Sequence, residues 1–307
     1  MTLRIGISGG GATVDRLVDQ AKEAEDDGFT SLWYAGATGI DPFAVLPLVG
    51  RATSTIGYGT SVVQTYPRHP VLMAQSAVAV AQAAGDDGRF TLGVGVSHQP
   101  VIEGIYGLDY GHNARHLREY LTVLDALLRE GRVRFTGEEY RAAAEIQARP
   151  QQPVPVVVAA LAPKSLRSAG ELAGGTITWM ANRRAVETLI APTIRKAAAG
   201  AGRPEPRIVV GLPVAVTDEV DGARETAARQ FAVYGMLPNY QRVLAAGGAA
   251  TPAEAAIVGP EDTVAAALRD LHAAGATDLW AAPFPVGDDR RASRQRTRAL
   301  LRDLVAG

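Results

Sequence analysis

Short apolar runs alternate with longer amphipathic stretches along the whole of this 307-residue chain. Runs of the first kind are typical of buried strands, and apolar residues three and four positions apart are typical of helices. The predicted strands are Leu3–Ser8, Ser31–Gly36, Ile56–Val62, Phe90–Val96, Val154–Leu161, Thr176–Ala181, Ile208–Thr217 and Asp278–Phe284. The predicted helices are Val14–Asp27, Pro42–Ala52, Pro70–Ala84, His116–Glu130, Lys164–Ala173, Arg184–Ala199, Asp221–Tyr234, Asp262–Ala274 and Arg290–Val305.

Eight strands, each followed by a helix, form the pattern of a closed (β/α)8 barrel, or TIM barrel. An open, doubly wound α/β sheet uses the same alternation, usually with fewer strands, so the count favours the barrel. We expect a single barrel domain over residues 1–307, with insertions after the fourth and seventh strands. The connections 97–114 and 132–153 exceed the usual length, and loops of that size on a barrel are usually functional lids or local insertions.

One sequence pattern recurs along the chain. Gly28-Phe-Thr-Ser-Leu-Trp33 and Gly275-Ala-Thr-Asp-Leu-Trp280 share Gly-x-Thr-x-Leu-Trp, and Gly175-Thr-Ile-Thr-Trp179 is a looser version. In each, glycine is expected to end a helix, threonine to open a strand and tryptophan to lie within that strand. The pattern indicates a repeated βα unit, with chance in an alanine- and glycine-rich chain as the alternative.

Composition and charge narrow the class of protein. The formal net charge is -1, which indicates no nucleic-acid partner, and the arginines of 290–302 are expected to form a solvated helix face. The amino terminus resembles a strand rather than a signal peptide, and the apolar runs are too short to cross a bilayer. We therefore expect a soluble, cytoplasmic protein without a membrane partner. With 0 cysteines, disulfides, thiolate metal sites and a cysteine nucleophile are excluded.

Two motifs that suggest cofactors or metals fail in detail. Gly9-Gly10-Gly11 is followed by Val14, where a dinucleotide fingerprint requires a small residue. The acidic residue expected at the end of the second strand is also absent, because Tyr34-Ala35-Gly36 stands there. His112 and His116 have the spacing of metal ligands on a helix, but no acidic general base lies between them. We expect no metal.

Residues 56–70 are the most informative stretch. An apolar run ends in the small residues Thr60-Ser61-Val62, and a loop with Arg68-His69-Pro70 follows. In a strand–loop–helix unit these polar groups lie beyond the carboxyl end of the strand, where parallel sheets place their ligands. A cofactor-binding strand end is expected here, with an ordinary buried strand end as the alternative.

The stretch 89–99 points to the same end of the barrel. Gly93 and Gly95 allow close backbone approach, which suits a flat ring lying against the sheet. Ser97 and His98 then emerge where the catalytic groups of barrels emerge. His98 suits proton transfer because its unperturbed pKa lies near neutrality, although a lone histidine can simply hydrogen-bond to a carbonyl.

Residues 157–165 combine a strand with a helix that starts at Pro163. Free N–H groups at that helix start, together with Lys164, make a plausible phosphate cradle. Many α/β proteins have such a helix without a ligand, so this local signal is weak on its own.

Taken together, these motifs resemble the luciferase-like superfamily of flavin and deazaflavin oxidoreductases. The carriers of the resemblance are Thr60-Ser61-Val62, Arg68-His69-Pro70, the Gly-Arg-x-x-Leu-Gly-Val-Gly stretch 88–95, Gly175-Thr-Ile-Thr-Trp-Met180, Gly211-Leu-Pro-Val-Ala-Val-Thr217 and Tyr234…Leu-Pro-x-Tyr240. Val96-Ser-His-Gln99 and Arg115-His-Leu-Arg-Glu-Tyr-Leu121 are similar to an F420-dependent subgroup. The resemblance runs from the first strand to Leu301, and the order and spacing of the pieces make it specific.

The resemblance implies a (β/α)8 barrel with coenzyme F420, or FMN as the alternative, at the carboxyl-end mouth. It implies that Ser61-Val62 forms a bulge with a non-prolyl cis peptide behind the ring, and that His98 acts as the acid or base near the reactive carbon. The residues implied to bind the cofactor are Thr60, Ser61, Val62, Arg68, His69, Gly95, Ser97, Ala160, Leu161, Ala162, Lys164 and Trp179. His69 has a second interpretation, as the cap of the following helix.

The chain departs from its relatives at two places. Many deazaflavin-binding members have an acidic or amide residue just after the second strand, but here Ala35-Gly36-Ala37-Thr38-Gly39 stands there, and the nearest acid is Asp41. Gly174-Gly175 stands where relatives often have Asp-Gly. Both changes concern individual contacts rather than the fold.

Three functions follow from the resemblance. The first is an F420-dependent oxidoreductase that transfers a hydride to or from a small-molecule substrate. The second is an FMN-dependent monooxygenase supplied by a separate reductase, and the third is a deazaflavin-binding protein without catalysis. A homodimer is expected from the family resemblance alone. The sequence does not identify the substrate, because the least predictable loops build its pocket.

Overall fold

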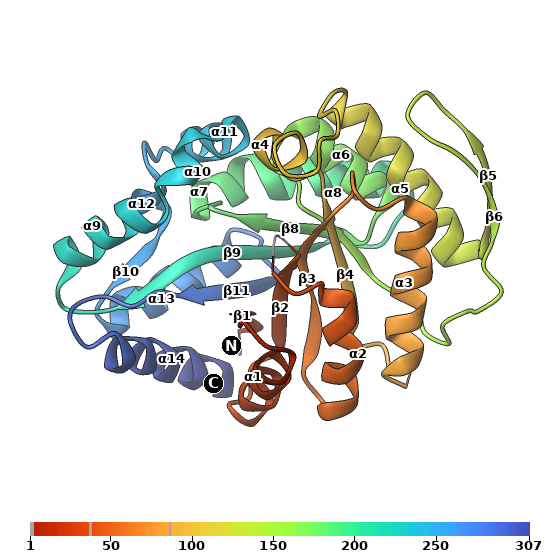
Figure 1. Cartoon of the computed structure of the whole chain (residues 1–307). Helices are drawn as coiled ribbons and strands as arrows, with labels where there is room; N and C mark the ends of the chain where they lie inside the picture. The colour runs from red at the N-terminus through yellow and green to blue at the C-terminus, as the bar shows by residue number, and fades with distance from the viewer. Residues whose placement is uncertain (1–2, 37–38, 86) are drawn as a thin grey trace.

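Eight parallel strands close into a barrel in the computed structural model, which describes residues 3–36, 39–85 and 87–307 (Figure 1). In order around the barrel they are β1 (Ile5–Gly9), β2 (Ser31–Gly36), β3 (Gly57–Gln64), β4 (Phe90–Gly95), β7 (Val156–Val158), β8 (Gly175–Trp179), β9 (Arg207–Val216) and β11 (Asp278–Pro283). β11 pairs with β1 and β8 with β9, which closes the cylinder. The predicted (β/α)8 barrel is confirmed.

Helices cover the outside of the barrel (Figure 1). The larger ones are α1 (Val14–Asp26), α2 (Pro42–Ala52), α3 (Pro70–Ala83), α5 (Asn113–Glu130), α6 (Pro163–Leu172), α8 (Ala191–Gly200), α13 (Glu261–Ala273) and α14 (Arg290–Ala306). Their local causes are visible in the sequence. In α1 the Thr13 hydroxyl caps the first turn by accepting from the backbone N–H of Arg16, and Leu17, Ala21 and Ala24 form the buried face.

The first insertion follows β4 and the second follows β9, as predicted. The first contains α4 (Gln99–Ile102), α5 and an antiparallel hairpin of β5 (Arg132–Thr136) and β6 (Arg141–Glu145). The second contains α9 (Val220–Gln230), α10 (Ala232–Met236), α11 (Pro238–Ala246) and α12 (Pro252–Ala255). We expected a loop where this hairpin lies. The sequence did not reveal the hairpin, because the alternation of exposed and covered residues in its strands is too short to distinguish from irregular chain.

Two other elements differ from the predictions. β7 has only three residues, because its pairing with β4 and β8 is confined to 156–158. The short strand β10 (Ile257–Gly259) was not predicted, and it pairs with Val214–Val216 at the end of β9. The predicted helix 184–199 is divided into α7 (Arg183–Ala185), a π-helical turn η1 (Val186–Ile190) and α8. The π-helical turn lies just before Pro192. Proline has no N–H to donate to a carbonyl of the preceding turn, which is consistent with a wider turn there.

The recurrent Gly-x-Thr-x-Leu-Trp pattern has a structural meaning. Gly28 and Gly275 adopt φ of +79° and +116°, which L side chains rarely adopt, and each follows a helix. Trp33 and Trp280, on β2 and β11, belong to a compact cluster separate from the main core. That cluster, which Val157, Ile177 and Val209 complete, fills the barrel interior. The repeat therefore places one tryptophan inside the cylinder from each of two strands.

The amino-terminal end of the barrel carries a buried carboxylate. Asp278 accepts from Arg4 Nε at 2.9 Å and from Arg207 Nη2 at 2.8 Å. Burial by itself would raise the pKa of Asp278, but hydrogen bonds and charge from Arg207 and Arg4 outweigh it and lower the pKa. Because both arginines are partly exposed, solvent screens these pairs.

We expect Asp278→Asn to lower the free energy of unfolding by about 1–2 kcal/mol at neutral pH. A carboxylate with a depressed pKa stabilises the folded state above its ordinary pKa, and this contribution disappears as the pH falls through the lowered value. The difference between wild type and variant, measured by denaturant titration, should therefore shrink in acid. The matched control is Asp303→Asn, at an exposed position, and equal stability of both variants at neutral pH would contradict the prediction.

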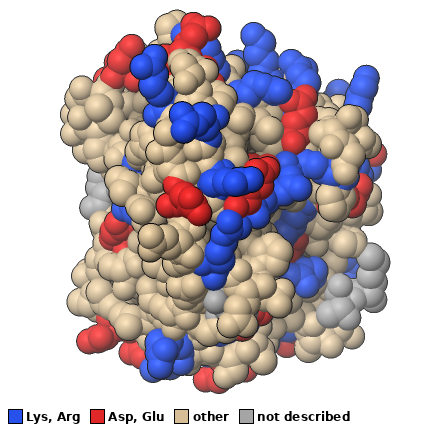
Figure 2. All heavy atoms as spheres, turned by 90° about the vertical axis from the view of Figure 1, so that its right-hand side faces the viewer, with Lys and Arg blue, Asp and Glu red and all other residues tan. Residues whose placement is uncertain are grey.

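The surface shows no dominant charge on the face that carries α5 and the β5–β6 hairpin. Figure 2 shows basic and acidic side chains interleaved there, as in the pairs of Arg115 with Glu138 and of Arg118 with Glu171. Over residues 3–36, 39–85 and 87–307, no helix combines the length and apolar character needed to cross a membrane.

Candidate active site

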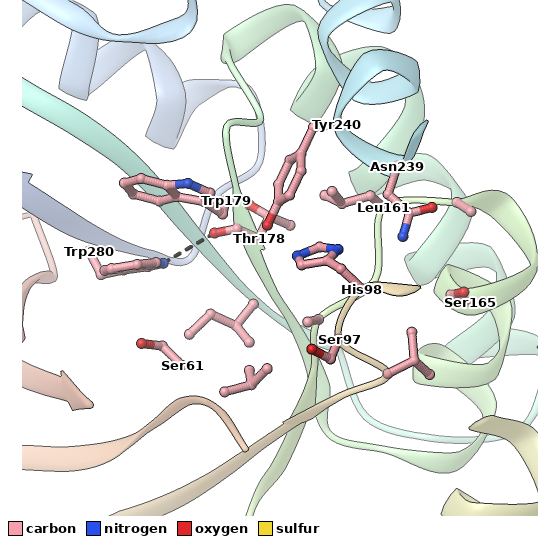
Figure 3. A pocket seen from close by; sticks show the side chains of 15 residues that line it. Ser61, Ser97, His98, Leu161, Ser165, Thr178, Trp179, Asn239, Tyr240 and Trp280 are labelled. Carbon is pink, nitrogen blue, oxygen red and sulfur yellow. Dashed lines mark hydrogen bonds between the residues drawn. The ribbon is translucent and has the colours of Figure 1, made fainter. Parts of the chain in front are cut away.

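A pocket opens at the carboxyl ends of the barrel strands, beneath helix α11 of the second insertion (Figure 3). Its walls and mouth enclose about 740 Å³ of empty space, part of it open to solvent. Its lining residues are Ser61, Val62, Val96, Ser97, His98, Ala159, Leu161, Ala162, Ser165, Ile177, Thr178, Trp179, Asn239, Tyr240 and Trp280. This is the end of the barrel at which the sequence predicted a site.

Seven of the predicted site residues line this pocket together, although they come from separate parts of the chain. They are Ser61, Val62, Ser97, His98, Leu161, Ala162 and Trp179. The other six predicted residues do not line it: they are Thr60, Arg68, His69, Gly95, Ala160 and Lys164. The reasons differ from residue to residue and follow from the local structure.

The floor of the pocket is the irregular end of β3. The Ser61-Val62 peptide is cis, as the resemblance implied, and the pairing of β3 with β4 shifts register between Gly59 and Val63. Thr60 is fully buried, and its hydroxyl donates to the Gly93 carbonyl at 2.6 Å and accepts from the Gly93 N–H at 2.8 Å. Thr60 therefore ties β3 to β4 and does not face the pocket.

Gly93 and Gly95 make room for this bulge. A Cβ at Gly93 would lie 1.9 Å from the Thr60 carbonyl oxygen. At Gly95 it would lie 2.8 Å from Cγ2 of Val62 and 2.9 Å from Cβ of Ala159. These glycines let the neighbouring strands approach, and Val62 and Ala159 face the pocket beside them, while the contact of Gly95 with a cofactor stays a prediction.

His98 enters the pocket after a sharp turn of the backbone. Ser97 has a φ of 63°, in the left-handed region that non-glycine residues rarely occupy, and its carbonyl accepts from the Tyr110 hydroxyl at 2.7 Å. His98 is the N-cap residue of α4 but makes no side-chain cap bond, so its ring is free to face the cavity (Figure 3). Burial lowers the pKa of His98, which favours neutral imidazole.

Aromatic side chains form one wall and the roof. Trp179 and Trp280 stack with ring centroids 5.0 Å apart, and Trp280 Nε1 donates to the Thr178 carbonyl. Tyr234, from the second insertion, packs edge-on against Trp179 at 5.9 Å. Nε1 of Trp179 is buried and has no hydrogen-bond acceptor. Burial raises the pKa of the nearby Tyr234 phenol, and the indole N–H of Trp179 partly offsets this rise. The insertion is thus anchored to the barrel by ring packing.

The start of α6 forms another edge of the pocket. Ala162 is its N-cap residue and supplies no side-chain bond to the first turn, so the N–H groups of that turn lack a side-chain cap. Ala162 and Ser165 line the pocket, whereas Ala160 is fully buried in the main core and Lys164 is exposed. The start of α6 thus presents backbone and Ser165 to the pocket, with the Lys164 side chain at the surface, and the phosphate cradle stays a prediction.

Arg68 and His69 serve the neighbouring structure. Arg68 donates to Asp41 at 2.6 Å and lies over the ring of Phe43 at 4.6 Å. His69 caps α3, with Nδ1 accepting from the backbone N–H of Val71, so the second interpretation of this residue is confirmed. Asp41 also caps α2, while Ala37 and Thr38 lie outside the described residues.

The two histidines with metal-ligand spacing do not share a site. His116 is buried, hydrogen-bonds through Nε2 to Thr65 at 2.9 Å, and stacks on Tyr66 with centroids 3.7 Å apart. Burial lowers its pKa to about 4. His112 lies outside this cluster and pairs with Glu139. Within the part of the chain that the structure describes, no group of three or more potential metal-ligating side chains occurs.

The sequence reasoning missed several lining residues. They are Val96, Ala159, Ser165, Ile177, Thr178, Asn239, Tyr240 and Trp280. Trp280 had a signal, because it repeats the pattern of Trp33, and Tyr240 belongs to a stretch that carried the family resemblance. Neither signal indicated that the second insertion folds back over the mouth.

A (β/α)8 barrel with a pocket at the carboxyl ends of its strands defines a class of proteins that bind small molecules at that mouth. A family model described as luciferase-like monooxygenase matches residues 2–278, so the chain belongs to the luciferase-like monooxygenase family. An uncharacterized protein of Mycobacterium tuberculosis is 30% identical over 295 residues, covering 83% of this chain and 86% of that protein. The F420-dependent glucose-6-phosphate dehydrogenase of Kineococcus radiotolerans is 30% identical over 232 residues, covering 70% and 68%.

Solved structures agree on the fold. The coenzyme F420-dependent tetrahydromethanopterin reductase from Methanopyrus kandleri superposes with a TM-score of 0.78 at 23% identity, covering 100% of this chain and 99% of that one. The oxygenating constituent of 3,6-diketocamphane monooxygenase from Pseudomonas putida, in complex with FMN, gives 0.74 at 17% identity, covering 100% and 98%. At these identities the likeness concerns the fold alone.

Proposed function

We propose that this protein is an oxidoreductase that binds coenzyme F420 and transfers a hydride between it and a small organic substrate. The carrying observation is His98, a partly buried imidazole without a cap bond, which faces a pocket with flat aromatic walls at the barrel mouth. Relatives named F420-dependent oxidoreductases support the choice of cofactor.

The residues present fit a planar ring with an anionic tail. Trp179 and Trp280 offer flat surfaces on one side, and Val62 and Ala159 offer small apolar groups on the floor. The first turn of α6, whose N–H groups have no side-chain cap, suits an anion because a helix amino terminus carries partial positive charge. Ser165, which lines the pocket at this turn, adds a hydroxyl donor.

When bound, the deazaflavin supplies a carrier of hydride. The residues of the chain then have separate tasks. His98 accepts the proton that an alcohol substrate loses, or donates the proton that a carbonyl substrate gains. Its lowered pKa favours the role of acceptor at neutral pH. The aromatic roof around Tyr234 and Tyr240 restricts the access of water.

Two alternatives use the same fold. An FMN-dependent monooxygenase is favoured by the fold shared with an FMN complex, and a deazaflavin-binding protein without catalysis would need the same pocket. Parallel titration with F420 and FMN distinguishes the monooxygenase from the proposed function. A search for turnover with alcohols, enones and quinones distinguishes the binding protein, which would show none.

We expect purified protein to bind F420 more tightly than FMN in parallel titrations followed by cofactor fluorescence. Replacing Ala162 with Asp should weaken binding of both cofactors by about tenfold, because it places negative charge beside the anion-binding turn of α6. The matched control is Ala228→Asp, at an exposed position of α9 that is not among the pocket residues. Tight binding of FMN with no measurable affinity for F420 would reject the proposal in favour of the monooxygenase.

A further inference from the structure

Tyr240 brings a second polar group to the position of His98. Its ring lies 5.5 Å from the His98 ring, centroid to centroid, and packs edge-on against Tyr234 at 4.9 Å. The side chain is 9% exposed, and its hydroxyl points down into the pocket, toward Thr178 and His98 (Figure 3). No hydrogen bond joins this hydroxyl to another of the lining side chains drawn there.

The two groups have complementary hydrogen-bonding roles. Burial raises the pKa of the Tyr240 phenol, so this group remains a protonated donor. Burial lowers the pKa of His98, so its imidazole is neutral and keeps an acceptor nitrogen. An alcohol oxygen can accept from the first group and donate to the second, and a carbonyl oxygen can accept from the phenol. An isolated carbon–carbon double bond offers neither group a partner.

The rest of the pocket is uncharged. None of the fifteen residues that line it is Asp, Glu, Lys or Arg. Beside His98 and Tyr240, away from the α6 turn, a carboxylate or phosphate on the reacting part of a substrate would therefore lose hydration without gaining a counter-charge. Arg242 is near the rim, but its guanidinium donates to the Asn239 amide oxygen and to the Pro238 carbonyl on an exposed helix face. Leu161, Ile177 and Trp179 instead offer apolar surface.

We propose that Tyr240 and His98 together bind the oxygen of an uncharged, largely apolar alcohol or ketone. The phenol donates to this oxygen, and the imidazole accepts its proton when the substrate is an alcohol. Only the identity of the hydride carrier rests on the proposed function. Binding of the substrate oxygen depends on Tyr240 and His98 and not on the cofactor. It separates this protein from relatives whose named substrate carries a phosphate.

The experiment compares two matched ligands, 2-octanol and 2-hydroxyoctanoate, which differ in that a carboxylate replaces the methyl group next to the carbinol carbon. Their affinities are measured by ligand-observed NMR titration of cofactor-free and of F420-saturated protein. We expect 2-octanol to bind at least tenfold more tightly than 2-hydroxyoctanoate. Tyr240→Phe, which keeps the ring, should weaken binding of 2-octanol by about tenfold to a hundredfold, because the ligand oxygen then loses its donor.

Tyr58→Phe is the matched control, because it removes another buried hydroxyl without a partner, at the opposite end of β3 from the pocket. It should leave the affinity unchanged. Failure of 2-octanol to bind either form, equal affinity for both ligands, or equal loss in both variants would overturn the inference. Tyr240-dependent binding of 2-octanol without binding of F420 would support it and reject the proposed function instead.

Discussion

His98→Gln is expected to lower kcat for oxidation of an uncharged alcohol by about 10²–10⁴-fold, the range typical of a lost general base. Glutamine keeps a polar side chain of similar length but cannot accept the proton. Binding of F420 should be unaffected, because the α6 turn and the aromatic walls remain. Steady-state rates from the loss of F420 absorbance, together with a titration of cofactor binding, measure the two effects separately.

The pH dependence of the same reaction tests the protonation state of His98. The neutral imidazole is the active form, and burial holds its pKa below the ordinary value of 6.5. The rate in the wild type should therefore be constant around neutral pH and fall only below that value, as the imidazole becomes protonated. The titratable group that packs against it is Tyr240, which stays neutral in this range. The matched control, His272→Gln in α13, should retain the wild-type rate and profile, and an unchanged rate in His98→Gln would reject the assignment.

Gly93→Ala is expected to lower the free energy of unfolding by about 3 kcal/mol, which combines overpacking with the loss of strand-to-strand hydrogen bonds. The added methyl would lie 1.9 Å from the Thr60 carbonyl oxygen and 3.1 Å from Cγ1 of Val62. Backbone must move to relieve the first contact, and movement breaks the bonds between the Thr60 hydroxyl and Gly93. Denaturant titration measures the loss.

The same substitution should also weaken cofactor binding, because Val62 lines the pocket. The matched control is Gly222→Ala in α9, where an added Cβ meets nothing within 4 Å. That change should stabilise the protein by about 0.5–1 kcal/mol, since alanine favours helix more than glycine. Equal effects of the two substitutions would show that the β3–β4 contact does not constrain the site.

Three of the predicted residues that line the pocket lie within the last half of a strand or just after it. Ser61, Ser97 and His98 come at the ends of β3 and β4, and strand ends meet at one edge of a parallel barrel whatever the details of packing. At Gly95 one residue pattern suits two functions, approach by a ring or by a strand. The positions of Val62 and Ala159 show the approach of strands, which the sequence alone did not indicate.

Lys164 and Arg68 show a second limit. A positive side chain near a strand end predicts an anion site, but the direction of the side chain depends on neighbours distant in sequence. Arg68 turns toward Asp41, 27 positions away, and Lys164 lies on the exposed side of α6. The start of α6, where Lys164 lies, still presents its backbone N–H groups to the pocket.

The sequence alone determined the class of fold and the end of the barrel that holds the site, because hydrophobic periodicity and strand ends are local properties. It also predicted that His98 lies at this end, because the residue follows the fourth strand. The tertiary structure decided which groups meet there. Tyr240 and Asn239 lie more than one hundred residues after His98, and the folding of the second insertion over the mouth brings them to it. That placement depends on the packing of Tyr234 and Phe231 against Trp179, a long-range contact that local periodicity does not encode.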